Sequence, residues 1–197
     1  MSKRKKIVSI VFSILIFIIA WLAFCGYQWS WGPFVKLHDY KTASLAGNAE
    51  QYALDTIEVE RNSPLKNKNI VFLGSSVTYG ASSMGVSFAD YIGAMNDCNI
   101  IKEAVSGTTL VDEGVDSYIS RLNKIDTQNA DIFVCQLSTN DATQKKPLGE
   151  INNSENINDF DTKTVAGAIE YIIAYAKDKW DCPVVFYTNP KYDSANY

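Results

Sequence analysis

Three short clusters of small and polar residues follow three apolar runs, and their residue types suit chemistry on an acyl carbonyl. The clusters are residues 74–76, after the run NIVFL, residues 106–109, after NIIKEAV, and residues 138–141, at the end of ADIFVCQLS. A serine where a strand turns into a helix lies at the helix N-terminus, where the dipole and free N–H groups favour negative charge. A glycine N–H and an asparagine carboxamide can both donate to a tetrahedral oxyanion. The clusters therefore predict acyl transfer if the fold brings them together.

The elements that must position these clusters alternate between strand-like and helical segments. Four strands are predicted, at 69–73, 99–105, 130–138 and 182–190. Helical spacing is found at 87–95 and 115–125, and Asp161 is predicted to cap a further helix with one apolar face, formed by Val165, Ala168, Ile169, Ile172 and Ala176. Alternating strands and helices indicate β-α-β units. We expect a three-layer α/β/α sandwich with a parallel, flavodoxin-like sheet, in which ligands bind beyond the carboxyl ends of the strands.

The three clusters also resemble a known family. FLGSSVTYG, EAVSGTT and LSTND are similar to the first three motif blocks of the SGNH hydrolases, or GDSL lipases and esterases, in the family's order, and the resemblance runs from Asn69 to the C-terminus. It implies a serine esterase in which Ser76 is the nucleophile. The Gly107 N–H and the Asn140 side chain would form the oxyanion hole. No cofactor and no metal are implied, because side chains carry out the covalent catalysis.

Two departures from the family pattern bear on activity. Ser75 stands where the family has an aspartate before the nucleophile, and the fourth signature, D-x-x-H, is absent before the chain ends at NPKYDSANY. The only histidine, His38, is interpreted as a linker residue, and Asp193 has no histidine to orient. We therefore expect a truncated SGNH hydrolase that is inactive as given, since a serine hydroxyl without a general base is a weak nucleophile.

Each candidate residue also has a purely structural interpretation. Ser76 can be a helix N-cap, and Ser75 can be the cap instead, or the nucleophile if the register is shifted by one residue. Gly107 can be a turn glycine with positive φ. The pair Asn140–Asp141 can form an Asx-turn after a strand.

The N-terminal region predicts a membrane anchor. Basic residues occupy positions 3–6, and residues 7–27 carry no charge, a length that suffices to cross a bilayer as a helix. We predict a cytoplasmic end at 1–6, a transmembrane signal anchor at 7–27, a juxtamembrane connector at 28–66 and an extracytoplasmic SGNH-like domain at 67–197. A cleaved signal peptide and lipidation at Cys25 are the alternatives.

Composition excludes several other classes of function. Beyond residue 6 the chain has 14 basic against 22 acidic residues, which disfavours binding to nucleic acid. One histidine and the absence of metal-ligand spacing disfavour a zinc site. The four cysteines, at 25, 98, 135 and 182, leave open a disulfide among the last three.

Two functional hypotheses follow. The first is a membrane-anchored, extracytoplasmic serine esterase whose substrate is a small ester or an acylated carbohydrate, as the resemblance implies. The second is a non-catalytic anchored α/β domain that binds a small ligand or a partner protein at the same edge of the sheet.

Overall fold

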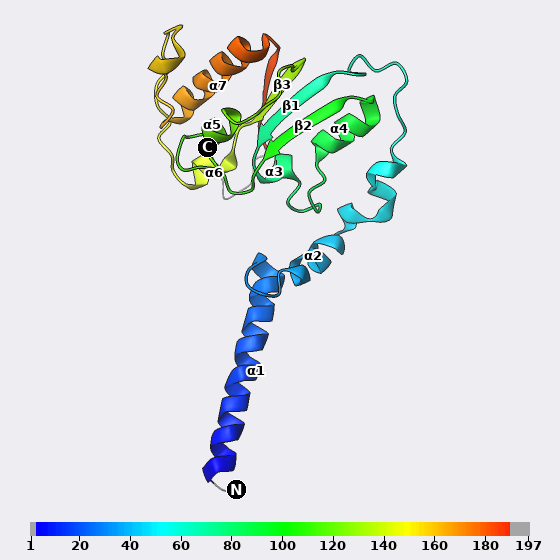
Figure 1. Cartoon of the computed structure of the whole chain (residues 1–197), viewed down its shortest axis with the longest axis vertical. Helices are drawn as coiled ribbons and strands as arrows, with labels where there is room; N and C mark the ends of the chain where they lie inside the picture. The colour runs from blue at the N-terminus through cyan, green and yellow to red at the C-terminus, as the bar shows by residue number, and fades with distance from the viewer. Residues whose placement is uncertain (1–2, 190–197) are drawn as a thin grey trace. The chain divides into compact units, whose positions relative to one another are not determined.

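The computed structural model describes residues 3–189, which form two compact units (Figure 1). The first unit is Met1–Ala53 together with Ser82–Met84, and the second is Leu54–Ala81 together with Gly85–Tyr197. The three candidate clusters all belong to the second unit.

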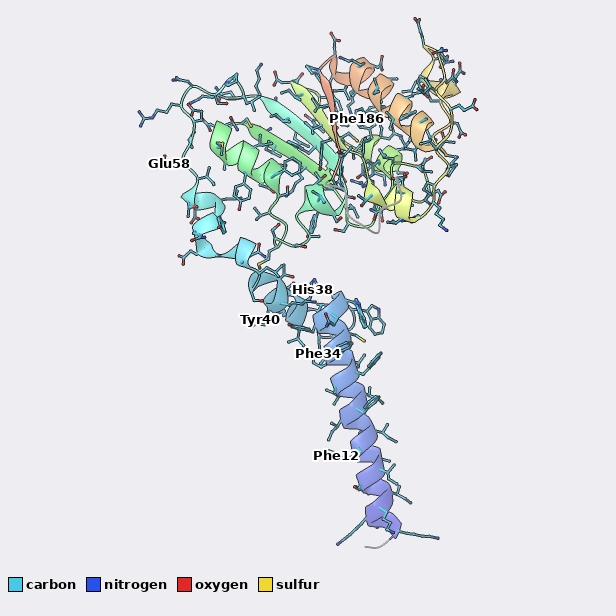
Figure 2. The ribbon with its side chains drawn as sticks, turned by 180° about the vertical axis from the view of Figure 1, so that it is seen from behind. Phe12, Phe34, His38, Tyr40, Glu58 and Phe186 are labelled. Carbon is cyan, nitrogen blue, oxygen red and sulfur yellow. The ribbon has the colours of Figure 1, made fainter. Side chains whose placement is uncertain are left out.

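A long apolar helix makes up most of the first unit. Helix α1 (Lys3–Trp29) includes the whole predicted span 7–27, and Phe12 and most of the other large apolar side chains along it are exposed (Figure 2). By length and composition α1 can cross a membrane. Short 3₁₀ helices η1 (Ala46–Asn48) and η2 (Glu50–Tyr52) end this unit.

Helix α2 (Lys36–Ala43) packs against the end of α1 (Figure 2). A Cβ added at Gly26 would lie 2.4 Å from the carbonyl oxygen of Phe34, so glycine permits this close approach. Lys41 Nζ donates to Gln28 Oε1 at 2.6 Å. His38 is half-buried on α2, and its Nδ1 lies 3.1 Å from the carbonyl oxygen of Tyr27. The predicted connector is thus partly helical.

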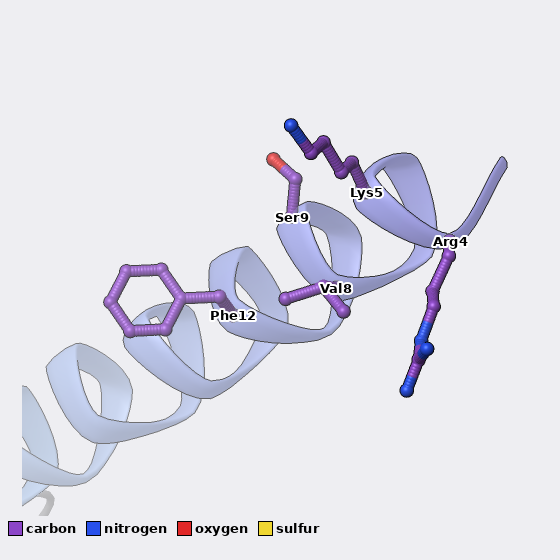
Figure 3. A pocket seen from close by; sticks show the side chains of 5 residues that line it. All are labelled: Arg4, Lys5, Val8, Ser9 and Phe12. Carbon is purple, nitrogen blue, oxygen red and sulfur yellow. The ribbon is translucent and has the colours of Figure 1, made fainter. Parts of the chain in front are cut away.

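The beginning of α1 is basic on one part of its surface and apolar on the next. Arg4, Lys5, Val8, Ser9 and Phe12 line an open hollow along this single helix (Figure 3). None of the candidate catalytic residues lies there.

The second unit contains a four-stranded parallel sheet, as the sequence predicted. Its strands are β1 (Asn69–Gly74), β2 (Asn99–Ala104), β3 (Ile132–Gln136) and β4 (Val184–Tyr187), in the order β2-β1-β3-β4. In the register, Gly74 is opposite Ala104 and Leu73 is opposite Cys135. The carboxyl ends of the three strands that precede the clusters therefore lie at one edge of the sheet.

Alternating side chains of β1 pack against helices on both faces of the sheet. Val71 and Leu73 face α5 (Tyr118–Leu122) and α7 (Val165–Trp180), while Ile70 and Phe72 face α4 (Phe88–Asn96). All four side chains are buried, which explains why β1 is apolar throughout. The three-layer α/β/α arrangement is confirmed.

Helix α7 corrects one sequence prediction. Its N-cap is Thr164, whose hydroxyl accepts from the Gly167 N–H, and not Asp161. The Asp161 backbone instead lies so close to Gly167 that a Cβ there would be 2.2 Å from the Asp161 carbonyl oxygen. The predicted apolar face is correct, with Ala168, Ile172 and Ala176 fully buried.

The remaining elements are short. They include helices α3 (Ser76–Tyr79) and α6 (Thr139–Thr143), at the candidate clusters, and 3₁₀ helices η3 (Leu54–Thr56) and η4 (Ile157–Asp159). All four cysteines are free, so the disulfide that the sequence left open is not formed.

Candidate active site

Ser76 is the first residue of α3, directly after β1. The N-cap position belongs to Ser75, whose side chain makes no capping hydrogen bond, so the interpretation of Ser76 as a helix cap is wrong. Ser75 is completely buried and its hydroxyl has no hydrogen-bond partner among the described residues, whereas Ser76 is half-buried. Of the two serines, Ser76 is the one that a substrate can reach.

The buried side-chain amide of Gln136 holds the turn that carries Ser76 in place. Oε1 of Gln136, a fully buried residue at the end of β3, accepts from the Ser75 N–H at 3.0 Å and from the Thr78 N–H at 3.3 Å. The Thr78 hydroxyl also donates to it, at 2.7 Å. The backbone on both sides of Ser76 is therefore fixed to the third strand.

Gly74 makes room for this arrangement. A Cβ at Gly74 would lie 1.7 Å from Thr78 Oγ1 and 3.0 Å from Gln136 Oε1. Because Thr78 is β-branched and its hydroxyl is engaged with Gln136, its side chain has little freedom to move aside. A glycine is required here by close approach.

Tyr187, from β4, completes the contacts under the Ser76 turn. Its hydroxyl lies 2.5 Å from Thr78 Oγ1 and 3.4 Å from Gln136 Oε1. Burial raises the pKa of Tyr187 to about 12. This phenol therefore stays protonated near neutral pH and supports the turn as a hydrogen-bond donor.

Gly107 lies in the exposed loop after β2 with a φ of 83°. A Cβ there would have no neighbour within 4 Å in the described part of the chain, so the need for glycine comes from the positive φ. Next to it, the Thr108 hydroxyl donates to the carbonyl oxygen of Val105 at 2.7 Å, which closes the loop.

Asn140 reaches from α6 to the Gly107 loop. Its Nδ2 donates to the carbonyl oxygen of Thr108 at 2.8 Å, and the Ser138 hydroxyl donates to the same oxygen at 2.9 Å. Ser138 is also the N-cap of α6, accepting from the Asn140 N–H. The Asn140 side chain thus binds another loop and does not form an Asx-turn.

Asp141 makes a second connection between these two loops. Its buried carboxylate accepts from the backbone N–H groups of Leu110 at 2.9 Å and Val111 at 3.1 Å. Burial is the main effect on this group and raises the pKa of Asp141, and the two backbone hydrogen bonds oppose the shift.

The structure therefore brings the three predicted clusters together. The cluster 74–76 contacts the loop of cluster 106–109 where the Val105 N–H donates to the carbonyl oxygen of Gly74 at 3.3 Å. Gln136, two residues before cluster 138–141, binds the Ser75 N–H. Clusters 106–109 and 138–141 are joined where Asn140 donates to the carbonyl oxygen of Thr108. His38 belongs to the other unit, and Asp193 lies outside the described residues.

Sequence reasoning missed the groups that support the site. In the sequence, Gln136 belongs to an apolar run and Tyr187 to the predicted fourth strand, and neither pattern predicts a supporting role. The one available signal was a glutamine within the apolar run ADIFVCQLS, because a polar side chain in a strand covered on both faces needs an internal partner. Among the described residues, no group of three or more histidine, cysteine or carboxylate side chains is arranged to hold a metal ion.

Comparison with known proteins identifies similar folds. No protein-family model matches the sequence, and no curated protein matches it. One solved structure is 25% identical over 64% of this chain and 58% of its own, with a TM-score of 0.54. A protein from Lactobacillus plantarum is 23% identical over 63% of this chain and 57% of its own, with a TM-score of 0.53. A Bacteroides ovatus protein, provisionally described as a GDSL-like lipase, is 20% identical over 64% of this chain and 74% of its own, with a TM-score of 0.49.

These similarities concern the fold. The matched region spans somewhat more than half the length of the first two proteins. The first two structures share the α/β fold of the matched region.

Replacement of Gln136 by leucine should destabilise the second unit. Gln136→Leu leaves the Ser75 and Thr78 donors buried without an acceptor, at a cost of about 1–3 kcal/mol for each unsatisfied group. The loss in the free energy of unfolding is measured by denaturant unfolding of the full chain in detergent, with proteolysis as the readout. The exposed Gln144→Leu is the matched control and should stay within about 0.5 kcal/mol of wild type. Equal stability of the two variants would contradict the support role.

The raised pKa of Asp141 predicts a pH-dependent stability. The Asp141 carboxyl binds its proton more tightly in the native state than in the unfolded chain. Its contribution to the free energy of unfolding is therefore fully present below the unfolded pKa of about 3.9 and is lost as pH rises through the raised folded pKa. Unfolding curves at a series of pH values should therefore show wild type losing stability relative to Asp141→Asn as pH rises from acid to neutral. The variant Asp126→Asn, at an exposed carboxyl, should run parallel to wild type.

Proposed function

We propose that the second unit is a serine acyl hydrolase of SGNH type, with Ser76 as nucleophile. The observation that supports this most directly is the hydrogen-bonded joining of the Ser76 turn, the Gly107 loop and α6 at one edge of the sheet. A half-buried serine above a buried support is what covalent catalysis requires, because the hydroxyl must be accessible and held in place.

The oxyanion of the tetrahedral intermediate would be bound by two donors. The backbone N–H of Gly107 is one, as the resemblance of the second motif block implies, and Gly107 lies in an exposed loop. Asn140 is the other. A carboxamide has two N–H groups, so one can hold the Thr108 carbonyl while the second donates to the oxyanion. Loss of one such donor typically lowers kcat by about 10²–10³.

The general base is the part of the mechanism that this sequence does not supply. The only histidine is His38, whose Nδ1 is engaged at the carbonyl of Tyr27 in the first unit. We therefore expect the 197 residues to react slowly, because a serine hydroxyl without a general base is a weak nucleophile.

The substrate proposed is a small ester or an acylated carbohydrate outside the cytoplasm. Its chemical class is what the resemblance to SGNH hydrolases implies. Its location follows from the anchoring proposed for α1, in which the basic residues 3–6 stay in the cytoplasm and the second unit is exported. The charge of the chain agrees with a neutral substrate, since acidic residues outnumber basic ones by 22 to 14 after position 6.

Active-site labelling tests the proposed nucleophile. A fluorophosphonate probe should label the full-length protein, lose its target in Ser76→Ala, and react about 10²–10³-fold more slowly with Asn140→Ala, as expected for loss of an oxyanion donor. Ser75→Ala is the matched control, because that hydroxyl is buried and should not be needed for labelling. Absence of label in the folded protein would favour the alternative, a binding domain without catalysis.

Reporter fusions test the orientation in the membrane. Alkaline phosphatase fused to the C-terminus should be active, because it folds only outside the cytoplasm, and green fluorescent protein fused at the same place should be dark. Replacing the four basic residues 3–6 by glutamate should reduce phosphatase activity through loss of the positive-inside signal. Fluorescence with an inactive phosphatase would reverse the proposed topology.

A further inference from the structure

One charged side chain, Arg121 on α5, is buried beneath the two loops that carry Ser76 and Gly107. Its exposed fraction is 4%, and it lies 5.0 Å from the centre of the Tyr118 ring. A buried cation is costly unless each of its donors finds an acceptor. Its hydrogen bonds therefore indicate what it is held there to do.

All five N–H groups of the guanidinium have an acceptor. Nε donates to the carbonyl oxygen of Asp116 at 2.9 Å, and Nη1 donates to the carbonyl oxygen of Glu103 at 2.9 Å and to its carboxylate at 3.3 Å. Nη2 donates to the carbonyl oxygen of Gly74 at 2.9 Å and to the hydroxyl of Thr108 at 3.1 Å. Five donors is the full number an arginine has.

The two acceptors of Nη2 come from the two loops that the proposed chemistry needs. Gly74 precedes Ser76 by two residues, and Thr108 directly follows Gly107. A single planar nitrogen therefore bridges the backbone that leads to the nucleophile and the residue next to the proposed oxyanion donor. The same Thr108 is held from its other side by Asn140 and Ser138.

Stability alone is a weak reason for this arrangement. Among residues 3–189, the one carboxylate that pairs with the guanidinium is that of Glu103, and it is partly exposed to solvent. A buried ion pair is often no more stabilising than apolar side chains of the same volume. What an apolar side chain cannot do is fix two loops at a set separation through directed hydrogen bonds.

We propose that Arg121 is a positioning residue, which sets the distance between the Ser76 turn and the Gly107 N–H. This inference rests on the proposed function and adds to it a residue that touches neither the substrate nor the reacting atoms. Lysine cannot replace arginine here, because one ammonium on a flexible stem cannot reach Gly74, Thr108, Glu103 and Asp116 together.

Kinetics of Arg121→Lys provide the first test, in the full-length protein with a soluble ester. Misplacement of an oxyanion donor by about 1 Å can cost up to about 10²-fold, so kcat should fall by about 10–100-fold while KM stays within about twofold. Arg61→Lys, at an exposed arginine, is the matched control and should match wild type. In Arg121→Ala, added guanidinium ion at non-denaturing concentration should restore part of the rate, and it should not raise the rate of Arg121→Lys.

Hydrogen exchange provides a readout that does not depend on activity. The N–H groups of Val105, Leu110 and Val111 are hydrogen-bonded and should exchange slowly in wild type. In Arg121→Lys, exchange in segment 105–111 should accelerate about tenfold or more, while α7 exchanges as in wild type. If the wild-type protein does not hydrolyse the ester, the proposed function and the catalytic part of this inference are both overturned. Hydrogen exchange in segment 105–111 would still decide whether Arg121 holds the loop. Unchanged kcat together with unchanged exchange in Arg121→Lys would overturn the inference entirely.

Discussion

The position of Ser76 depends on one buried amide oxygen, that of Gln136. Oε1 of Gln136 accepts hydrogen bonds from the backbone on both sides of Ser76, and it does so from the end of a neighbouring strand. This is possible because β1 pairs in parallel with both β2 and β3, so the loops that follow all three strands start at one level. Gly74 lacks the Cβ that would displace Thr78 from the same oxygen. Strand register, a missing side chain and one buried acceptor together determine where Ser76 lies.

The interior beneath the candidate site is polar, and almost all of its groups are paired. Gln136, Asp141 and Arg121 are buried, and the acceptors and donors described above satisfy them across three loops. Among the described residues, only a few buried side-chain atoms lack a partner, and the hydroxyl of Ser75 is one of them. Networks of this kind limit local motion, because each loop is bound to at least two others. A site that stabilises developing charge benefits from such fixed dipoles, which need no reorganisation during the reaction.

The sequence predicted the strands, the layers and the three clusters, because these depend on local patterns. Apolar runs that end in glycine, serine or asparagine are visible within a few residues, and the face of α7 with Ala168, Ile172 and Ala176 follows from helical periodicity. It did not predict the roles of Gln136 or Arg121, because all but one of the partners described above lie 13 to 61 residues away. It also misplaced the cap of α7, since Asp161 and Thr164 have equally suitable side chains and tertiary packing decided between them.

The carbonyl group and side chain of Thr108 receive hydrogen bonds from residues on two different helices, α5 and α6, and from the cap of the second. Energies at positions that share a partner in this way do not add, and the second change in a pair often has an effect that depends on the first. In diverging lineages, an exchange at 108 would therefore be tolerated or rejected according to the residue at 121, which binds the hydroxyl, whereas 138 and 140 bind a carbonyl group that any residue at 108 supplies. Positions 108 and 121 should drift as a linked pair, and 138 and 140 as another, whereas exposed residues such as Gln144 should vary on their own.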